Sequence, residues 1–144
     1  MKRKMLMLLM PVFAFLIGPN FVSATSLDIS ITCNDTTVGS TTTCTVMGTT
    51  DGQISALHSE YAISEGATFS SFTPGSGWLG EGDNGSFDLF TDTNKTGTFP
   101  IGTFTLHTYA PGEVTITLFG IKAYDETFNN IGIISDVSTT FTVR

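Results

Sequence analysis

A period of two in the apolar residues constrains this fold more than any other feature of the sequence. Between Ile54 and Ile63, one face of an extended strand would carry Leu57, Ser59, Tyr61 and Ile63, and the other Ala56, His58, Glu60 and Ala62. Successive residues of a strand point to opposite sides of a sheet, so this alternation predicts a half-buried strand. One side is expected to pack on a core, and the other to face solvent or a partner.

Similar alternation recurs along the chain, interrupted by turn signals. It predicts strands over residues 25–33, 41–47, 54–63, 67–73, 86–91, 98–107, 114–119 and 137–143, with one strand and a loop within 121–134. Residues 49–52, 74–85 and 92–97 are expected to form turns or loops, with a bulge or a change of face near Pro100 and Gly102. No 3.6-residue apolar repeat follows residue 24.

These segments predict an all-β domain, an antiparallel jelly-roll β-sandwich of about eight to nine strands. Bulky aromatic side chains are available to fill the space between its two sheets. They are Phe69, Phe72, Trp78, Phe87, Phe90, Phe99 and Phe104.

The first 24 residues have the pattern of a secretory signal peptide. A basic start, Lys2 to Lys4, precedes an apolar run from Met5 to Ile17, and Val22-Ser23-Ala24 is a small-residue cleavage pattern. The alternative is an uncleaved membrane anchor, but the run is shorter than the roughly 20 residues of a spanning helix. We therefore expect cleavage after Ala24 and one domain over residues 25–144. The protein would be secreted, extracellular or at the cell surface, without membrane insertion.

The net charge of the chain limits the classes of partner that it can bind. Once the signal is removed, Lys95, Lys122 and Arg144 remain against 13 acidic residues, a formal balance of about −10. Phosphate binding needs clustered Lys or Arg, so we expect no nucleic-acid partner.

The two cysteines, Cys33 and Cys44, are expected to form a disulfide in an oxidising compartment. The alternative is a metal site, but it would need further Cys or His ligands, and none lies nearby in the sequence. The disulfide would close a loop of about 12 residues and remove roughly 3 kcal/mol of unfolded-chain entropy.

The order of several short motifs resembles that of a cohesin-like domain. Val38-Gly39 precedes the second strand, where the family has its VGxTVxV opening, and residues 54–63 are similar to its IxAfqfxlxYD strand. Residues 69–75 resemble the vxsvtpG segment. Residues 83–87 followed by 97–106 resemble the strand written G-xfaxltFkv. The resemblance covers most of the chain from Ser26 onward.

This resemblance implies a nine-stranded jelly-roll sandwich that is not an enzyme. Its partner would be a dockerin-like module, in extracellular polysaccharide-degrading or cell-surface assemblies. The partner surface is expected on the exposed face of residues 54–63, 86–91 and 98–107. Its candidate contact residues are Ala56, His58, Glu60, Asp88, Thr105 and His107.

Two other binding functions stay open. Trp78, in a glycine-rich loop, would stack on a sugar ring in a carbohydrate-binding module, with Tyr109 and Tyr124 assisting, or it would plug the edge of the sandwich. An extracellular polysaccharide would then be the partner. The third hypothesis is an Ig-like structural spacer of a surface protein.

Catalytic and metal chemistry find little support. His58 and His107 lie on predicted strands, without a nucleophile-elbow serine in the sequence. Glu81, Asp83, Asp88 and Asp92 are the candidates for a glycosidase carboxylate pair, which chance alone would supply in so acidic a chain. Residues 92–97 resemble the first half of a calcium loop but lack its closing Glu. We expect no catalytic residue, no metal and no cofactor.

Overall fold

The computed structural model describes residues 26–83 and 85–144, so the predicted signal peptide lies outside the described residues. These residues form seven strands: β1 (Leu27–Cys33), β2 (Thr41–Ile63), β3 (Ala67–Pro74), β4 (Leu79–Gly82), β5 (Ser86–Thr108), β6 (Gly112–Tyr124) and β7 (Val137–Val143). All pairings between them are antiparallel. In this part of the chain no helix has the length and apolar character to cross a membrane. The predicted all-β class is confirmed.

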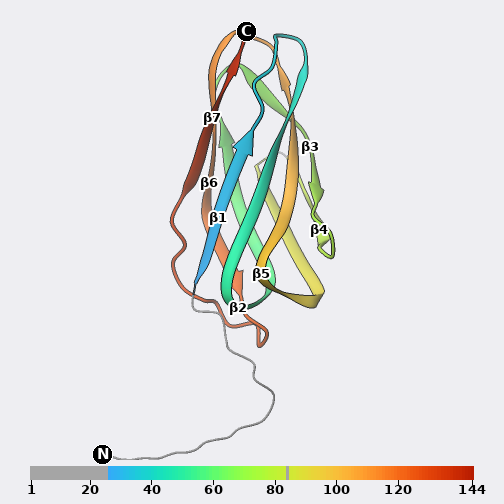
Figure 1. Ribbon diagram of the computed structural model, residues 1–144, viewed down its shortest axis with the longest axis vertical. Helices are drawn as coiled ribbons and strands as arrows, with labels where there is room; N and C mark the ends of the chain where they lie inside the picture. Colours follow the sequence, from blue (N-terminus) through green and yellow to red (C-terminus); the bar gives the residue numbers. More distant parts are fainter. Residues whose placement is uncertain (1–25, 84) are drawn as a thin grey trace, which may run out of the picture.

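The two longest strands, β2 and β5, create the sandwich. Each has 23 residues, runs along one layer, bends at the lower end of the molecule and returns in the other layer (Figure 1). They pair on both sides of the bend, with Thr50 opposite Gly97 and Ala56 opposite Phe90, and between these the register shifts around the pair of Ile54 and Lys95. The turns predicted at 49–52 and 92–97 are therefore wrong: their turn-favouring residues bend two paired strands instead of ending them. Seven strands replace the eight or nine expected, because β2, β5 and β6 each merge two predicted segments while β4 is an additional strand.

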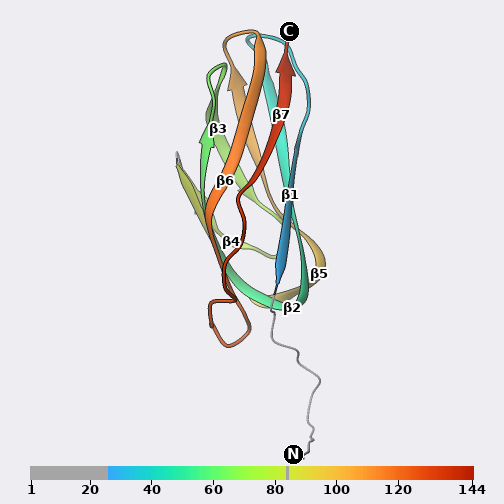
Figure 2. The ribbon, with the colours of Figure 1, turned by 90° about the vertical axis from the view of Figure 1, so that its left-hand side faces the viewer.

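The bends of β2 and β5 divide the strands into two layers. The first layer consists of β1, the first half of β2, the second half of β5, and β3. The second consists of β4, the first half of β5, the second half of β2, and β6. β7 pairs with β6 and lies beside β1, which closes one side of the sandwich (Figures 1 and 2).

The core lies between the layers and follows the predicted alternation. Leu57, Ser59 and Tyr61 are buried, whereas Glu60 and Ala62 are exposed, which confirms the two faces of this strand. At the centre, the Phe104 ring lies 4.8 Å from that of Tyr61, 4.9 Å from Phe72 and 5.9 Å from Phe87. Edge-to-face aromatic contacts of this kind add to the burial of apolar area.

Two local predictions need correction. Residues 74–85 were expected to form a loop, but they contain β4, which pairs with β5 from Leu79 to Gly82. Five glycines hid this strand from a pattern based on apolar alternation. Phe90 does not fill the core: it is 54% exposed, because Phe87 and Leu89 already occupy the inward positions of β5.

The bulge predicted near Pro100 and Gly102 is confirmed. Val46 pairs with Gly102 and Met47 with Pro100, so Ile101 is the extra residue on β5. A Cβ on Gly102 would lie 2.3 Å from the Phe72 ring, so the close approach of this aromatic side chain requires glycine here.

The Cys33–Cys44 disulfide is also confirmed. The two residues lie directly opposite each other where β1 and β2 pair, with Cα atoms 4.1 Å apart. The bond therefore joins the two strands at the end where the connecting segment leaves them.

The loop between β6 and β7 is organised by Asp125. Its carboxylate accepts hydrogen bonds from the Thr127 and Asn129 backbone N–H groups at 2.9 and 3.0 Å and from the Thr127 hydroxyl at 2.8 Å. The bonds from Asn129 and Thr127 lower the pKa of Asp125, because they stabilise the charged form. Ser55 on β2 donates to the Asp125 carbonyl, which ties this loop to the second layer.

Candidate docking face on the second layer

The outer face of the second layer brings side chains from four strands into register. Residues directly opposite one another in an antiparallel pair share one face of the sheet, so the pairing itself arranges them in rows. A charged row runs across β4, β5, β2 and β6: Glu81, Asp88, His58 and Lys122. A mostly apolar row lies beside it: Leu79, Phe90, Ala56 and Tyr124. We call these eight residues the two-row face.

The two-row face carries two exposed apolar side chains and a shallow hollow. Leu79 is 51% exposed and Phe90 54% exposed, and they lie opposite each other on β4 and β5. A shallow hollow of about 330 Å³ begins at Ala56, opposite Phe90, and is also lined by Lys122 and Tyr124. The hollow follows from the small side chain of Ala56, which sits between the larger residues of the neighbouring strands. Adjacent exposed apolar side chains of this size are typical of interaction surfaces.

The charged row is held in place by a direct contact at its centre. His58 Nδ1 forms a hydrogen bond with Asp88 Oδ1 at 2.6 Å. The His58 side chain is 30% exposed and that of Asp88 74%, so the pair lies at the surface, where solvent reaches it. Such exposed pairs contribute little to stability, about 0–1 kcal/mol, and their value lies in orientation.

A third row extends the face. Ser86 lies opposite Glu60, and Glu60 lies opposite Phe119 on β6. A Cβ on Gly120 would lie 2.6 Å from the Glu60 carboxylate, so glycine at a positive φ of 59° lets this side chain lie across β6.

The structure separates the predicted contact residues into two groups. Ala56, His58, Glu60 and Asp88 lie together on the outer face of the second layer. Thr105 and His107 belong to the second half of β5, opposite Thr43 and Thr41, and face outward from the first layer. The two groups therefore lie on opposite sides of the sandwich. The physical reason is the bend of β5, which carries its two halves into different layers.

Sequence reasoning did not single out Leu79, Phe90 or Lys122 as contact residues. Phe90 was foreseeable, because it shares the outward parity of Asp88 two positions earlier in the same strand. Leu79 and Lys122 were not, since their strand positions depend on β4 and on a bulge in β6 near Gly120. Glu81 had been considered only as a possible catalytic carboxylate.

The three aromatic residues considered for sugar binding do not form a common platform. Trp78 is 5% exposed; its Nε1–H donates to the Pro100 carbonyl at 3.0 Å, and its ring packs on Phe99 and under Lys95 Nζ. Tyr109 lies between β5 and β6, and Tyr124 at the opposite end of β6. Trp78 thus fills the edge of the sandwich in this structure.

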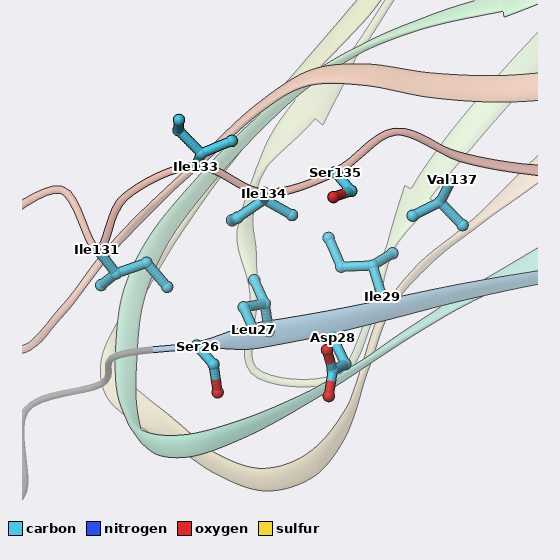
Figure 3. Close-up of a pocket in the computed structure, with 9 residues that line it drawn as sticks. All are labelled: Ser26, Leu27, Asp28, Ile29, Ile131, Ile133, Ile134, Ser135 and Val137. Carbon is cyan, nitrogen blue, oxygen red and sulfur yellow. The ribbon is translucent and has the colours of Figure 1, made fainter.

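A second crevice opens between β1 and the segment that leads into β7. Leu27 and Ile29 point into it toward Ile134 and Val137, whereas Asp28 points away (Figure 3). Its volume is about 360 Å³ and its lining is largely aliphatic. Its lining includes the serines Ser26 and Ser135 but no His or Cys side chain that could activate them or act as a nucleophile.

Among the residues considered for catalysis, Glu81, Asp88 and His58 are neighbours in the charged row, because Asp88 lies opposite both of the others. Within residues 26–83 and 85–144, no three His, Cys, Asp or Glu side chains gather as metal ligands would. Residues 92–97, considered as half of a calcium loop, lie within β5. His58 contacts the carboxylate of Asp88, and within the described residues no hydrogen bond joins either side chain to a serine or cysteine nucleophile.

Comparison with known proteins gives matches among solved structures only. No protein-family model matches the sequence, and no curated protein matches it. Solved structures do match. A non-cellulosomal cohesin from the archaeon Archaeoglobus fulgidus superposes with a TM-score of 0.70 at 15% identity, covering 82% of this chain and 91% of its own. This chain has a cohesin-like fold.

Two further cohesins superpose with similar scores. The cohesin module of a Clostridium perfringens family 33 glycoside hydrolase has a TM-score of 0.69 at 9% identity, covering 85% of this chain and 98% of its own. A cohesin from a type I cohesin–dockerin complex of Clostridium thermocellum has 0.65 at 11%, covering 85% and 97%. The cohesin-like β-sandwich predicted from motif order is thereby confirmed as a fold.

Proposed function

We propose that this protein is a secreted, non-catalytic assembly module whose two-row face binds a dockerin-like protein partner. The two-row face carries the proposal: exposed Leu79 and Phe90 stand beside a hollow, and a charged row flanks them. Apolar anchors with adjacent polar groups are the usual composition of protein-binding surfaces. The cohesin-like fold supports the class of partner, since one of the similar structures is a cohesin bound to a dockerin.

The chemistry of the face defines the partner further. An amphipathic helix laid across the strands would place an apolar stripe on Leu79, Phe90 and the Ala56 hollow. Glu81 and Asp88 would pair with a basic side chain on that helix, and Lys122 with an acidic one. The secreted location rests on the signal-peptide pattern and is consistent with the Cys33–Cys44 disulfide.

Titration calorimetry with a panel of purified type I and type II dockerins tests the proposal. We expect at least one dockerin to bind, and Phe90→Ser and Asp88→Lys each to weaken it about tenfold or more, because they remove an anchor and reverse a charge. His107→Ala is the matched control on the opposite face and should bind as the wild type does.

Contrary outcomes are specific. The proposal is wrong if no dockerin binds, or if His107→Ala weakens binding as much as Phe90→Ser does. Retention by a soluble glycan in affinity electrophoresis, lost in Tyr109→Ala or Tyr124→Ala, would favour the carbohydrate-binding alternative.

A further inference from the structure

The two-row face has a property that binding to a foreign partner does not require. When the order of its residues across the four strands is reversed, the reversed face is complementary to the original in charge and in side-chain size. The charged row begins with two acidic residues, Glu81 and Asp88, and ends with His58 and Lys122. Reversing the row therefore sets acidic groups against basic ones. A two-fold axis parallel to the strands, between β5 and β2, performs this reversal.

We propose that the two-row face also binds a second copy of this chain, in a weak symmetric dimer built on that axis. Under this symmetry Glu81 of one copy faces Lys122 of the other, and Asp88 faces His58. Each contact occurs twice, because the interface is isologous. The occupant is thus selected by charge complementarity along the whole row.

The apolar row supports the same arrangement by size. The axis sets Phe90 of one copy against Ala56 of the other, and Leu79 against Tyr124. Phe90 is more than half exposed, and Ala56 lies in the lining of the hollow. A projecting ring therefore meets a depression, twice, on either side of the axis. In the third row Ser86 would face Glu60, a hydroxyl donor opposite a carboxylate acceptor.

The size of the face sets the strength. Four strands about 4.8 Å apart and three rows about 7 Å apart span roughly 20 by 20 Å, or on the order of 400 Å² per copy. The total is at the low end of specific interfaces, so we expect dissociation in the high-micromolar range. Such a dimer would cover the surface assigned above to a dockerin-like partner, so self-association and partner binding would exclude each other.

A charge-swap cycle tests this arrangement. Sedimentation velocity of the purified protein at low ionic strength, from about 10 µM to 1 mM, should show a reversible shift toward dimer. Lys122→Glu and Glu81→Lys should each weaken it about tenfold or more, because each places two like-charged pairs in the interface. The double variant Glu81→Lys/Lys122→Glu restores opposite charges and should recover most of the association.

Controls separate this geometry from net charge. His107→Glu adds a charge on the opposite face and should leave the dimer intact. A wild type that stays monomeric up to 1 mM, or a double variant no better than the single ones, overturns the proposed dimer. A monomer that still binds a dockerin through Phe90 would overturn self-association alone, whereas a dimer without any dockerin partner would overturn only the proposed function.

Discussion

At the scale of single residues, the direction of a side chain decides between core and surface. Phe87 and Phe90 lie three positions apart on β5, yet Phe87 is 1% exposed and Phe90 54% exposed. Phe87 stacks on Phe72 with ring centroids 4.7 Å apart, while Phe90 lies beside Leu79 at the surface. The same residue type therefore serves packing at one position and, in our proposal, recognition at the other.

This difference predicts that replacing Phe with Ala affects the free energy of unfolding very differently at the two positions. Phe87→Ala should lower the free energy of unfolding by about 3–5 kcal/mol, because it leaves a cavity between the layers. Phe90→Ala should change it by no more than about 0.5 kcal/mol, as surface substitutions usually do. Urea unfolding monitored by the fluorescence of Trp78 measures both. Equal losses for the two variants would contradict the assigned directions.

Tyr61 predicts a response to alkaline pH. Its ring is buried, its hydroxyl donates to the Asp83 carbonyl, and burial together with the Asp83 charge raises the pKa of Tyr61 above its ordinary value of 10.0. Stability linked to this group is present in full below pH 10.0 and is lost as pH rises through the higher pKa of the folded state.

Tyr61→Phe should therefore lower stability by about 1 kcal/mol at neutral pH, through the lost hydrogen bond, but flatten the decline above pH 10. Urea midpoints measured between pH 7 and 11 provide the check. Tyr109→Phe, at a half-exposed tyrosine, is the control and should follow the wild-type profile. A Tyr61→Phe profile as steep as that of the wild type would refute the linkage.

At the scale of elements, the bends of β2 and β5 show which parts of the fold the sequence pattern predicts and which it does not. The alternation located the buried face of residues 54–63, because parity within a strand is a local property, but Phe90 was wrongly expected in the core. It did not show that 41–47 and 54–63 are halves of one strand, since pairing between β2 and β5 through the bend is not local. Consequently, Ala56, His58, Glu60 and Asp88 lie together as expected, whereas Thr105 and His107 lie on the other layer.

The disulfide predicts a loss of stability on its removal. Cys33→Ser/Cys44→Ala should lower the free energy of unfolding by about 3 kcal/mol, because the bond restricts a loop of about 12 residues in the unfolded chain. Cys44 is fully buried, so alanine is the less disruptive replacement there. Comparing oxidised wild type, reduced wild type and the double variant in urea measures the effect. A reduced wild type as stable as the oxidised protein would contradict this prediction.

At the scale of the whole molecule, the two layers divide the surface by chemistry. The outer face of the first layer carries hydroxyl groups in neighbouring strands, such as Thr32, Thr45 and Thr103, which lie opposite one another. The second layer carries the apolar and charged rows. Because β2 and β5 contribute to both layers, a single pair of strands supplies a hydroxyl-rich face and, in our proposal, a recognition face.

The acidic surface as a whole predicts a dependence of stability on salt. Thirteen acidic residues face three basic ones in the chain beyond the signal region, so self-repulsion should destabilise the fold at low ionic strength. Raising the salt from about 10 to 150 mM shortens the Debye length from about 30 to 8 Å and should raise the urea midpoint.

Glu65 and Glu113 line one hollow beside Tyr109, so Glu65→Gln should stabilise by up to about 0.5 kcal/mol at low salt and less at high salt. Asp35→Asn should not, because Asp35 accepts a 2.8 Å hydrogen bond from the Thr142 N–H and lies 3.6 Å from Arg144 Nη2. If both variants respond to salt alike, the response comes from net charge alone, and the local crowding of Glu65 and Glu113 has no part in it.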